Sequence, residues 1–146
     1  MDRPIPLVPS SLRWAVVGLV AAGIVAVSVV PTGTAVQTTG PLDLVGVDKY
    51  FHALGYAGLA VTLAYALAEW SPRRAAAAVF ATAFVCGLAV ELLQLSLPYR
   101  QYSGLDLLAN AVGATVVAST WAAVGGRLRF RRVRTATNGD VGRREA

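Results

Sequence analysis

Four long apolar runs, separated by short polar breaks, organise this chain. They cover residues 14–30, 51–70, 75–97 and 105–124. A helix that crosses a membrane needs about 17–25 mostly apolar residues, and each run has that length. Proline or glycine closes the last three runs, because proline lacks a backbone N–H and glycine accepts left-handed geometry. The pattern predicts an all-α fold, an integral membrane four-helix bundle.

The apolar runs divide the chain into three parts. We expect a short N-terminal segment at 1–13, a four-helix transmembrane domain at 14–126 and a basic tail at 127–146. The tail is polar from Thr135 onward, so we expect it to be disordered. The run at 14–30 exceeds the about 7–15 apolar residues of a cleavable signal peptide, so we expect it to be retained.

Composition agrees with a membrane protein. Hydrophobic residues make up 55% of the chain and charged residues only 14%, whereas soluble domains carry about 25% charged residues. The net charge of +5 does not indicate a nucleic-acid partner, because the arginines flank apolar runs without an RNA- or DNA-binding pattern. The single cysteine, Cys86, lies within an apolar run and is typical of a buried structural thiol.

The placement of basic residues predicts the orientation. Four spans put both termini on one side, and that side holds all but two of the 13 lysines and arginines. The two exceptions are Lys49 and Arg100. Basic loops stay in the cytoplasm. We therefore expect a multi-pass protein of the cell membrane with both the N-terminus and the C-terminus cytoplasmic.

Small residues recur at four-residue spacing in three of the runs. Such stripes let helix backbones approach closely in a membrane. They are Gly18, Ala22 and Ala26 in the first run, Ala60, Ala64 and Ala68 in the second, and Ala109 and Gly113 in the fourth. The sequence therefore suggests, without deciding, which helix faces meet.

Polar and charged residues from three separate stretches fall at one level, near the outer ends of the last three runs. They are Asp48, Lys49, His52, Glu91, Gln94, Arg100, Asp106 and Asn110. The pairs at spacings of three or four share a helix face. Lipid does not accept such groups, so we expect them to turn inward and form one ligand-binding site.

Glu91 is the residue of this set for which burial in the membrane costs most. If the third helix ends near Leu97, Glu91 lies about 9 Å inside it, at ~1.5 Å per residue. A charge at such depth costs about 2–3 kcal/mol unless it is paired. His52, Lys49 and Arg100 are the cations available to pair with it.

Purely structural roles also fit several of these residues. Asp48 and Asp106 suit helix N-termini, and Lys49 can extend toward lipid head groups. Asn110 and Gln94 can join helices by hydrogen bonds. A network that only locks the fold is therefore one reading of the set.

Three segments resemble the VanZ-like family of small membrane proteins, named for a protein linked to teicoplanin resistance. Residues 48–56 resemble its D-K-x-x-H-x-x-x-Y motif, and residues 87–94 its G-x-x-x-E-x-x-Q segment. Residues 98–113 resemble its P-x-R…D-x-x-x-N-x-x-G segment. No biochemical activity is established for the family, so the resemblance implies a site rather than a reaction. Val117 departs from the small residue often found there.

The leading expectation is a binding protein without catalysis. It would take a lipid head group, an envelope precursor or a glycopeptide-type amphiphile, with Lys49 and Arg100 meeting an anionic group. The alternative is an intramembrane enzyme for a lipid-linked or phosphorylated substrate. Its catalytic candidates are Glu91, His52 and Asp106. A transporter would lack a continuous polar path unless it formed an oligomer. We expect membrane lipids as partners, no cofactor and no dedicated metal site, because the spacing matches no metal motif.

Overall fold

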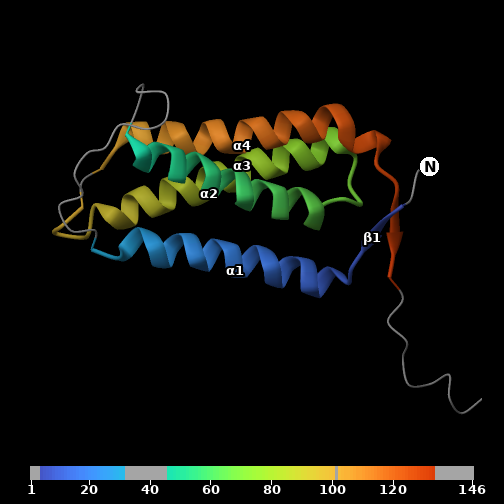
Figure 1. Ribbon diagram of the computed structural model, residues 1–146, viewed down its shortest axis with the longest axis horizontal. Helices are drawn as coiled ribbons and strands as arrows, with labels where there is room; N and C mark the ends of the chain where they lie inside the picture. The colour runs from blue at the N-terminus through green and yellow to red at the C-terminus, as the bar shows by residue number, and fades with distance from the viewer. Residues whose placement is uncertain (1–3, 32–45, 101, 134–146) are drawn as a thin grey trace, which may run out of the picture.

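The computed structural model describes residues 4–31, 46–100 and 102–133. Four helices form a bundle that is elongated along the helix axes (Figure 1). These are α1 (Ser10–Val29), α2 (Val47–Ala66), α3 (Pro72–Gln94) and α4 (Gly104–Val124). A short 3-10 turn, η1 (Gly125–Arg127), follows α4, and two short strands, β1 (Ile5–Leu7) and β2 (Phe130–Arg132), pair at one end. The predicted helical class is confirmed.

The helix boundaries differ from the apolar runs mainly at the polar ends. Helix α2 starts at Val47 and ends at Ala66, whereas its apolar run covers 51–70. Helix α3 starts with Pro72 in its first turn and ends at Gln94, three residues short of the expected end. Backbone hydrogen bonds do not depend on side-chain polarity, so a helix can begin before its apolar run. Proline suits a first turn because no partner is lost there.

Helix α2 is the centre of the bundle and contacts the other three helices. It buries Tyr56, Leu59, Ala60 and Leu63, among others, in the common core. Helix α1 is peripheral, because Arg13 and Ser28 are its only buried residues. The core therefore lies between α2, α3 and α4, and α1 covers one side of it (Figure 1).

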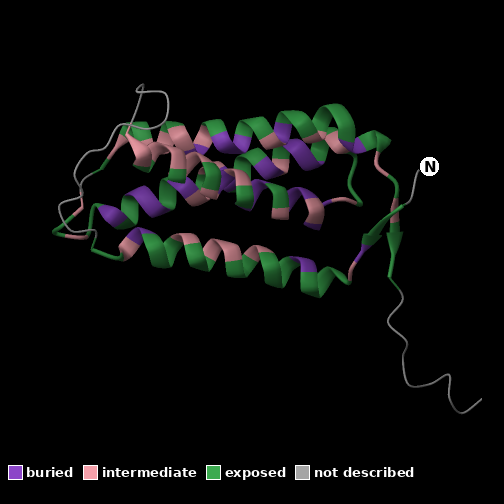
Figure 2. Cartoon of the chain, viewed as in Figure 1, coloured by how far each residue is buried: buried purple, intermediate pink, exposed green. Residues whose placement is uncertain are grey.

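The bundle is apolar on the outside and contains polar residues inside. Figure 2 shows exposed positions along the outer faces of all four helices. Leu19, Phe51, Leu54 and Val85 are each more than 60% exposed, whereas Glu91 is fully buried. Among the described helices, α1, α3 and α4 are long and apolar enough to cross a membrane. This inverted pattern suits a hydrocarbon surrounding.

The first and last elements meet in a parallel strand pair. Ile5 pairs with Phe130 and Leu7 with Arg132. The structure differs here from the expected disorder of the tail at 127–146, because Arg127 ends η1 and Phe130–Arg132 form β2. Two segments distant in sequence complete each other's backbone hydrogen bonds, which local polarity does not reveal. Residues 134–146 lie outside the described part of the chain.

Helices α2 and α4 approach each other closely at Gly113. A Cβ atom built on Gly113 would lie 2.0 Å from the carbonyl oxygen of Ala53 and 3.1 Å from the backbone nitrogen of Ala57. Gly113 of the expected α4 stripe therefore packs against α2. Ala60 and Ala64 of the expected α2 stripe are buried, whereas Ala68 lies beyond the end of the helix. The expected stripe of α1 does not pack, because Gly18 and the alanines at 22 and 26 are all exposed.

Candidate functional site

An ion-pair network joins the first turns of α2 and α4. Lys49 Nζ is paired with a carboxylate oxygen of Asp106 and with one of Asp48. Lys49 is only 17% exposed at its side chain, so it does not extend outward to head groups as its structural role would require. The tight α2–α4 contact at Gly113 brings these two helix starts together.

His52 lies one helical turn below Lys49 and continues the network. Its Nδ1 lies 3.1 Å from Oδ1 of Asn110. Its Nε2 lies 3.7 Å from Oδ2 of Asp106. Both ring nitrogens therefore face side chains of α4, and Asp106 is shared between Lys49 and His52. The side chains of His52 and Asp106 are mostly shielded, with 20% and 15% exposure.

Ser103 connects this network to α3. It is the N-cap of α4, and its side-chain oxygen accepts a hydrogen bond of 3.2 Å from the backbone N–H of Asp106. In a capping box the acidic residue three positions later would accept from the cap's own N–H. Here that N–H donates instead to Oε2 of Glu91, at 3.2 Å. Glu91 thus takes the capping role and leaves the Asp106 carboxylate free to pair with Lys49 and His52.

Glu91 is completely buried, and its second oxygen, Oε1, has no hydrogen-bond partner among the described residues. None of the expected cations, His52, Lys49 or Arg100, forms an ion pair with it within the described part of the chain. Asn110 is 1% exposed, and its Nδ2 also has no partner among the described residues. Asn110 of α4 lies against the face of α3 that carries Glu91, because a Cβ built on Gly87, one turn before Glu91, would lie 3.2 Å from Asn110 Nδ2.

Gln94 and Arg100, which the sequence assigned to the same site, bond instead to the end of α1. Gln94 Nε2 donates to the carbonyl oxygen of Ser28 at 3.1 Å. Arg100 donates to the carbonyl oxygen of Val30 at 3.0 Å, and the Tyr99 hydroxyl donates to that of Val29 at 2.8 Å. The last carbonyl groups of a helix have no hydrogen-bond partner within it, so these bonds satisfy the free carbonyl oxygens at the end of α1.

Two site residues were not identified from the sequence. Ser103 could have been found, because Ser103-x-x-Asp106 matches the capping-box spacing. Tyr56 could also have been found, because it is the tyrosine of the D-K-x-x-H-x-x-x-Y motif that residues 48–56 resemble. It is 2% exposed, and its hydroxyl has no partner among the described residues.

A second polar network lies at the opposite end of the bundle. Arg13 is buried and donates to the carbonyl oxygen of Ala66 at 2.9 Å and to Glu69 at 2.8 Å. Arg132 of β2 also pairs with Glu69. The hydrogen bonds from Arg13 and then Arg132 hold the pKa of Glu69 below its ordinary value of 4.5. This network fixes the end of α2 and attaches the strand pair to the bundle.

Among the described residues, no group of three or more histidine, cysteine, aspartate or glutamate side chains is arranged to hold a metal ion. No protein-family model matches the chain, and no curated protein or solved structure gives a significant match.

Proposed function

We propose that this chain is a VanZ-like, multi-pass protein of the cell membrane that binds the polar head of an amphiphile at the outer face. The three long apolar helices and the arginine-rich termini support the topology. Helix α2 would be the fourth span. It is less apolar, but its His52 and Tyr56 turn toward the bundle, while Phe51, Leu54 and Val61 are exposed and suit contact with lipid.

The observation behind this proposal is the pair of unpartnered polar atoms beside the ion-pair network. Glu91 Oε1 and Asn110 Nδ2 are buried without partners among the described residues. An unmade buried hydrogen bond costs about 1–3 kcal/mol. Each unsatisfied buried group weakens a network whose role is only to lock the fold. The free acceptor of Glu91 and the free donor of Asn110, at the same end of the bundle, favour a ligand that supplies both complements.

The charges favour a neutral head with hydroxyl or amide groups. Lys49 is already paired with two carboxylates, and Arg100 is bonded to the end of α1. Lys49 is therefore not free for the anionic group that the sequence suggested, and Arg100 lies against the end of α1, where its Nε has no partner among the described residues. Hydroxyl and amide groups offer a donor for Glu91 and an acceptor for Asn110. Such groups are found in lipid head groups, envelope precursors and glycopeptide-type amphiphiles.

The enzymatic alternative is less well supported. A proton shared between Glu91 and His52 requires a free ring nitrogen near Glu91. Both nitrogens of His52 instead face Asn110 and Asp106. The arrangement orients the histidine, as the alternative requires, but leaves no ring nitrogen open toward a substrate in this conformation.

The test is equilibrium binding of teicoplanin, as a glycopeptide-type amphiphile, to the full chain in lipid nanodiscs. Glu91→Gln keeps the size of the side chain but puts an amide group in place of the carboxyl group. Because an unmade buried hydrogen bond costs about 1–3 kcal/mol, we expect the variant to bind about tenfold or more weakly. Expression of the chain in a susceptible bacterium should raise the inhibitory concentration of teicoplanin, and Glu91→Gln should reduce that increase.

Thr120→Val is the matched control. Thr120 is an exposed residue of α4 whose hydroxyl donates to the carbonyl oxygen of Val116, away from the network. It should bind like the wild type. If Glu91→Gln folds, reaches the membrane and binds teicoplanin as tightly as Thr120→Val, the site is wrong.

A further inference from the structure

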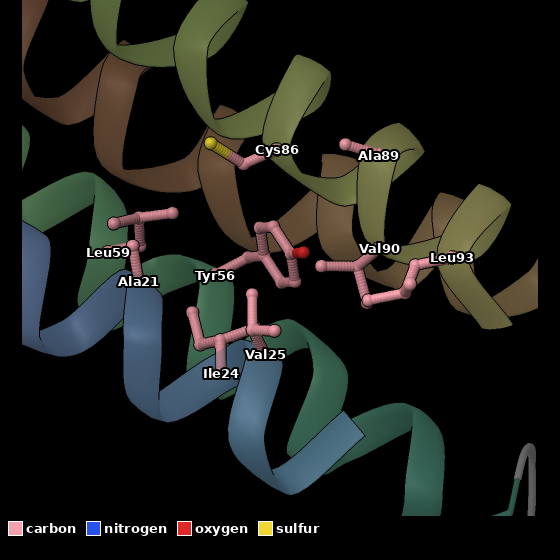
Figure 3. Close-up of a pocket in the computed structure, with 9 residues that line it drawn as sticks. All are labelled: Ala21, Ile24, Val25, Tyr56, Leu59, Cys86, Ala89, Val90 and Leu93. Carbon is pink, nitrogen blue, oxygen red and sulfur yellow. The ribbon is translucent and has the colours of Figure 1, made fainter. Parts of the chain in front are cut away.

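A separate apolar cavity lies between α1, α2 and α3. Its volume is about 200 Å³. The lining residues, drawn in Figure 3, are Ala21, Ile24, Val25, Tyr56, Leu59, Cys86, Ala89, Val90 and Leu93. An apolar cavity of about 150 Å³ already accepts a benzene-sized molecule. This cavity is therefore large enough for a short segment of a hydrocarbon chain.

The cavity has a buried floor and an exposed rim. Tyr56, Leu59 and Val90 are at most 5% exposed, whereas Val25 and Leu93 are 39% and 40% exposed. The rim belongs to the outer, apolar surface of the bundle. In a membrane this surface faces acyl chains, so the cavity is open to hydrocarbon from the side.

Tyr56 introduces one polar group into this apolar space. Figure 3 shows its ring among the other lining side chains, with the hydroxyl directed toward Val90. That hydroxyl has no hydrogen-bond partner among the described residues. A buried hydroxyl without a partner is destabilising, so its occupant should supply an acceptor.

The position of Tyr56 relates the cavity to the polar network. Tyr56 follows His52 by four residues on α2, which is about 6 Å along the helix at ~1.5 Å per residue. Val90 precedes Glu91 on α3. A molecule with a polar head at the network could therefore extend its chain into the cavity, with its first polar linkage near the Tyr56 hydroxyl.

Three occupants can be compared by their chemistry. A buried water needs about 2–4 polar partners, and the lining residues offer one hydroxyl. Plain hydrocarbon fills the space but leaves that hydroxyl unpaired. An acyl chain fills the space and brings a carbonyl oxygen that accepts the hydrogen bond.

We propose that the cavity binds the first segment of an acyl chain of a membrane lipid, whose carbonyl oxygen accepts a hydrogen bond from Tyr56. This inference rests on the proposed function, because the lipid head occupies the network around Glu91 and Asp106. It adds that the ligand enters laterally from the bilayer and that its chain is joined through a carbonyl group.

Cys86 provides the measurement. It lines the cavity and is the only cysteine of the chain, so its alkylation by N-ethylmaleimide reports how far the cavity is occupied. The full chain is placed in nanodiscs of diglucosyl dioleoylglycerol, whose head group is neutral and carries hydroxyls, or of its diether analogue, which lacks only the two carbonyl groups. Alkylation should be about three- to tenfold slower in the ester lipid, as expected for one hydrogen bond.

Tyr56→Phe removes the hydroxyl and keeps the ring, so it should abolish the difference between the two lipids. A reporter outside the cavity controls for reagent partitioning. This is Ala81→Cys in a Cys86→Ala background, at an exposed position of α3. It should react equally fast in both lipids.

Equal alkylation of Cys86 in the two lipids would overturn the inference, and so would a difference that persists in Tyr56→Phe. The wild-type comparison needs no variant and so does not depend on how Tyr56→Phe folds. Failure here leaves teicoplanin binding and its dependence on Glu91 intact. If Glu91→Gln does not weaken teicoplanin binding but Cys86 is still alkylated more slowly in the ester lipid, the head-group site is wrong and the acyl-chain cavity stands.

Discussion

Replacing Gly113 by alanine should force α2 and α4 apart just below the polar network. A Cβ at this position would lie 2.0 Å from the carbonyl oxygen of Ala53 and 2.9 Å from its carbonyl carbon. Close carbon–oxygen contacts between helices are about 3.3–3.6 Å, so the backbones would have to separate by about 1.3 Å or more. Overpacking of this kind typically costs about 1–3 kcal/mol. We expect the upper end, about 3 kcal/mol, because the obstructing atom belongs to the main chain.

The measurement is unfolding by sodium dodecyl sulfate in mixed micelles, followed by tryptophan fluorescence. Gly58→Ala is the matched control, since a Cβ on Gly58 of α2 meets nothing within 4 Å. It should be neutral or stabilising by up to about 1 kcal/mol, because alanine is the better helix former.

A second variant tests the cause of the destabilisation. Adding Ala53→Gly to Gly113→Ala should not restore stability, because it leaves the carbonyl oxygen of residue 53 in place. Unfolding of Gly113→Ala at the same detergent fraction as Gly58→Ala would refute the close backbone contact. Rescue by Ala53→Gly would show that a side chain, not the main chain, is the obstacle.

Two further predictions concern the network at the opposite end of the bundle. Arg13→Ala should destabilise the protein by about 1–3 kcal/mol, because the carbonyl oxygen of Ala66 loses its buried donor. The control is Arg73→Ala, at an exposed position, which should change stability by less than about 0.5 kcal/mol in the same unfolding assay. Equal effects of the two variants would contradict the structural role of Arg13. Glu69→Gln should lower stability at pH 7, and its difference from the wild type should shrink below pH 4.5, because Glu69 has a lowered pKa and contributes only while ionised. A difference that stays constant between pH 7 and pH 3 would exclude this contribution.

The local sequence pattern was sufficient to predict the four helices and the end of the bundle at which the polar residues lie. Four apolar runs of spanning length became four helices, because burial or lipid contact of such runs requires internal backbone hydrogen bonding. Lys49 and His52 on α2 were expected to lie beside Asp106 and Asn110 on α4, and they do. Asp48 was expected to turn inward with them, but it pairs with Lys49 and its side chain is 60% exposed. Because residues three or four apart lie on one face of a helix, their spacing predicted which of these polar side chains share a face.

The partners within the site were not predictable from spacing. Glu91 was expected to meet a cation, but it accepts a backbone N–H from Ser103. Arg100 was expected to contact the ligand, but it donates a hydrogen bond to the carbonyl oxygen of Val30 at the end of α1. In both cases a backbone group left free at a helix end takes the side chain, and its position depends on how the helices are packed.

The sequence by itself determined which segments are helical, which residues are too polar for lipid, and that these gather at one end. Only the tertiary structure decided the rest: that Asp106 is shared by Lys49 and His52, that β1 pairs with β2, and that Tyr56 faces a cavity. Hydropathy and periodicity are properties of neighbouring residues along the chain. Pairing and cavities arise between segments about 30 or more residues apart, and depend on close contacts such as that of Gly113 with Ala53.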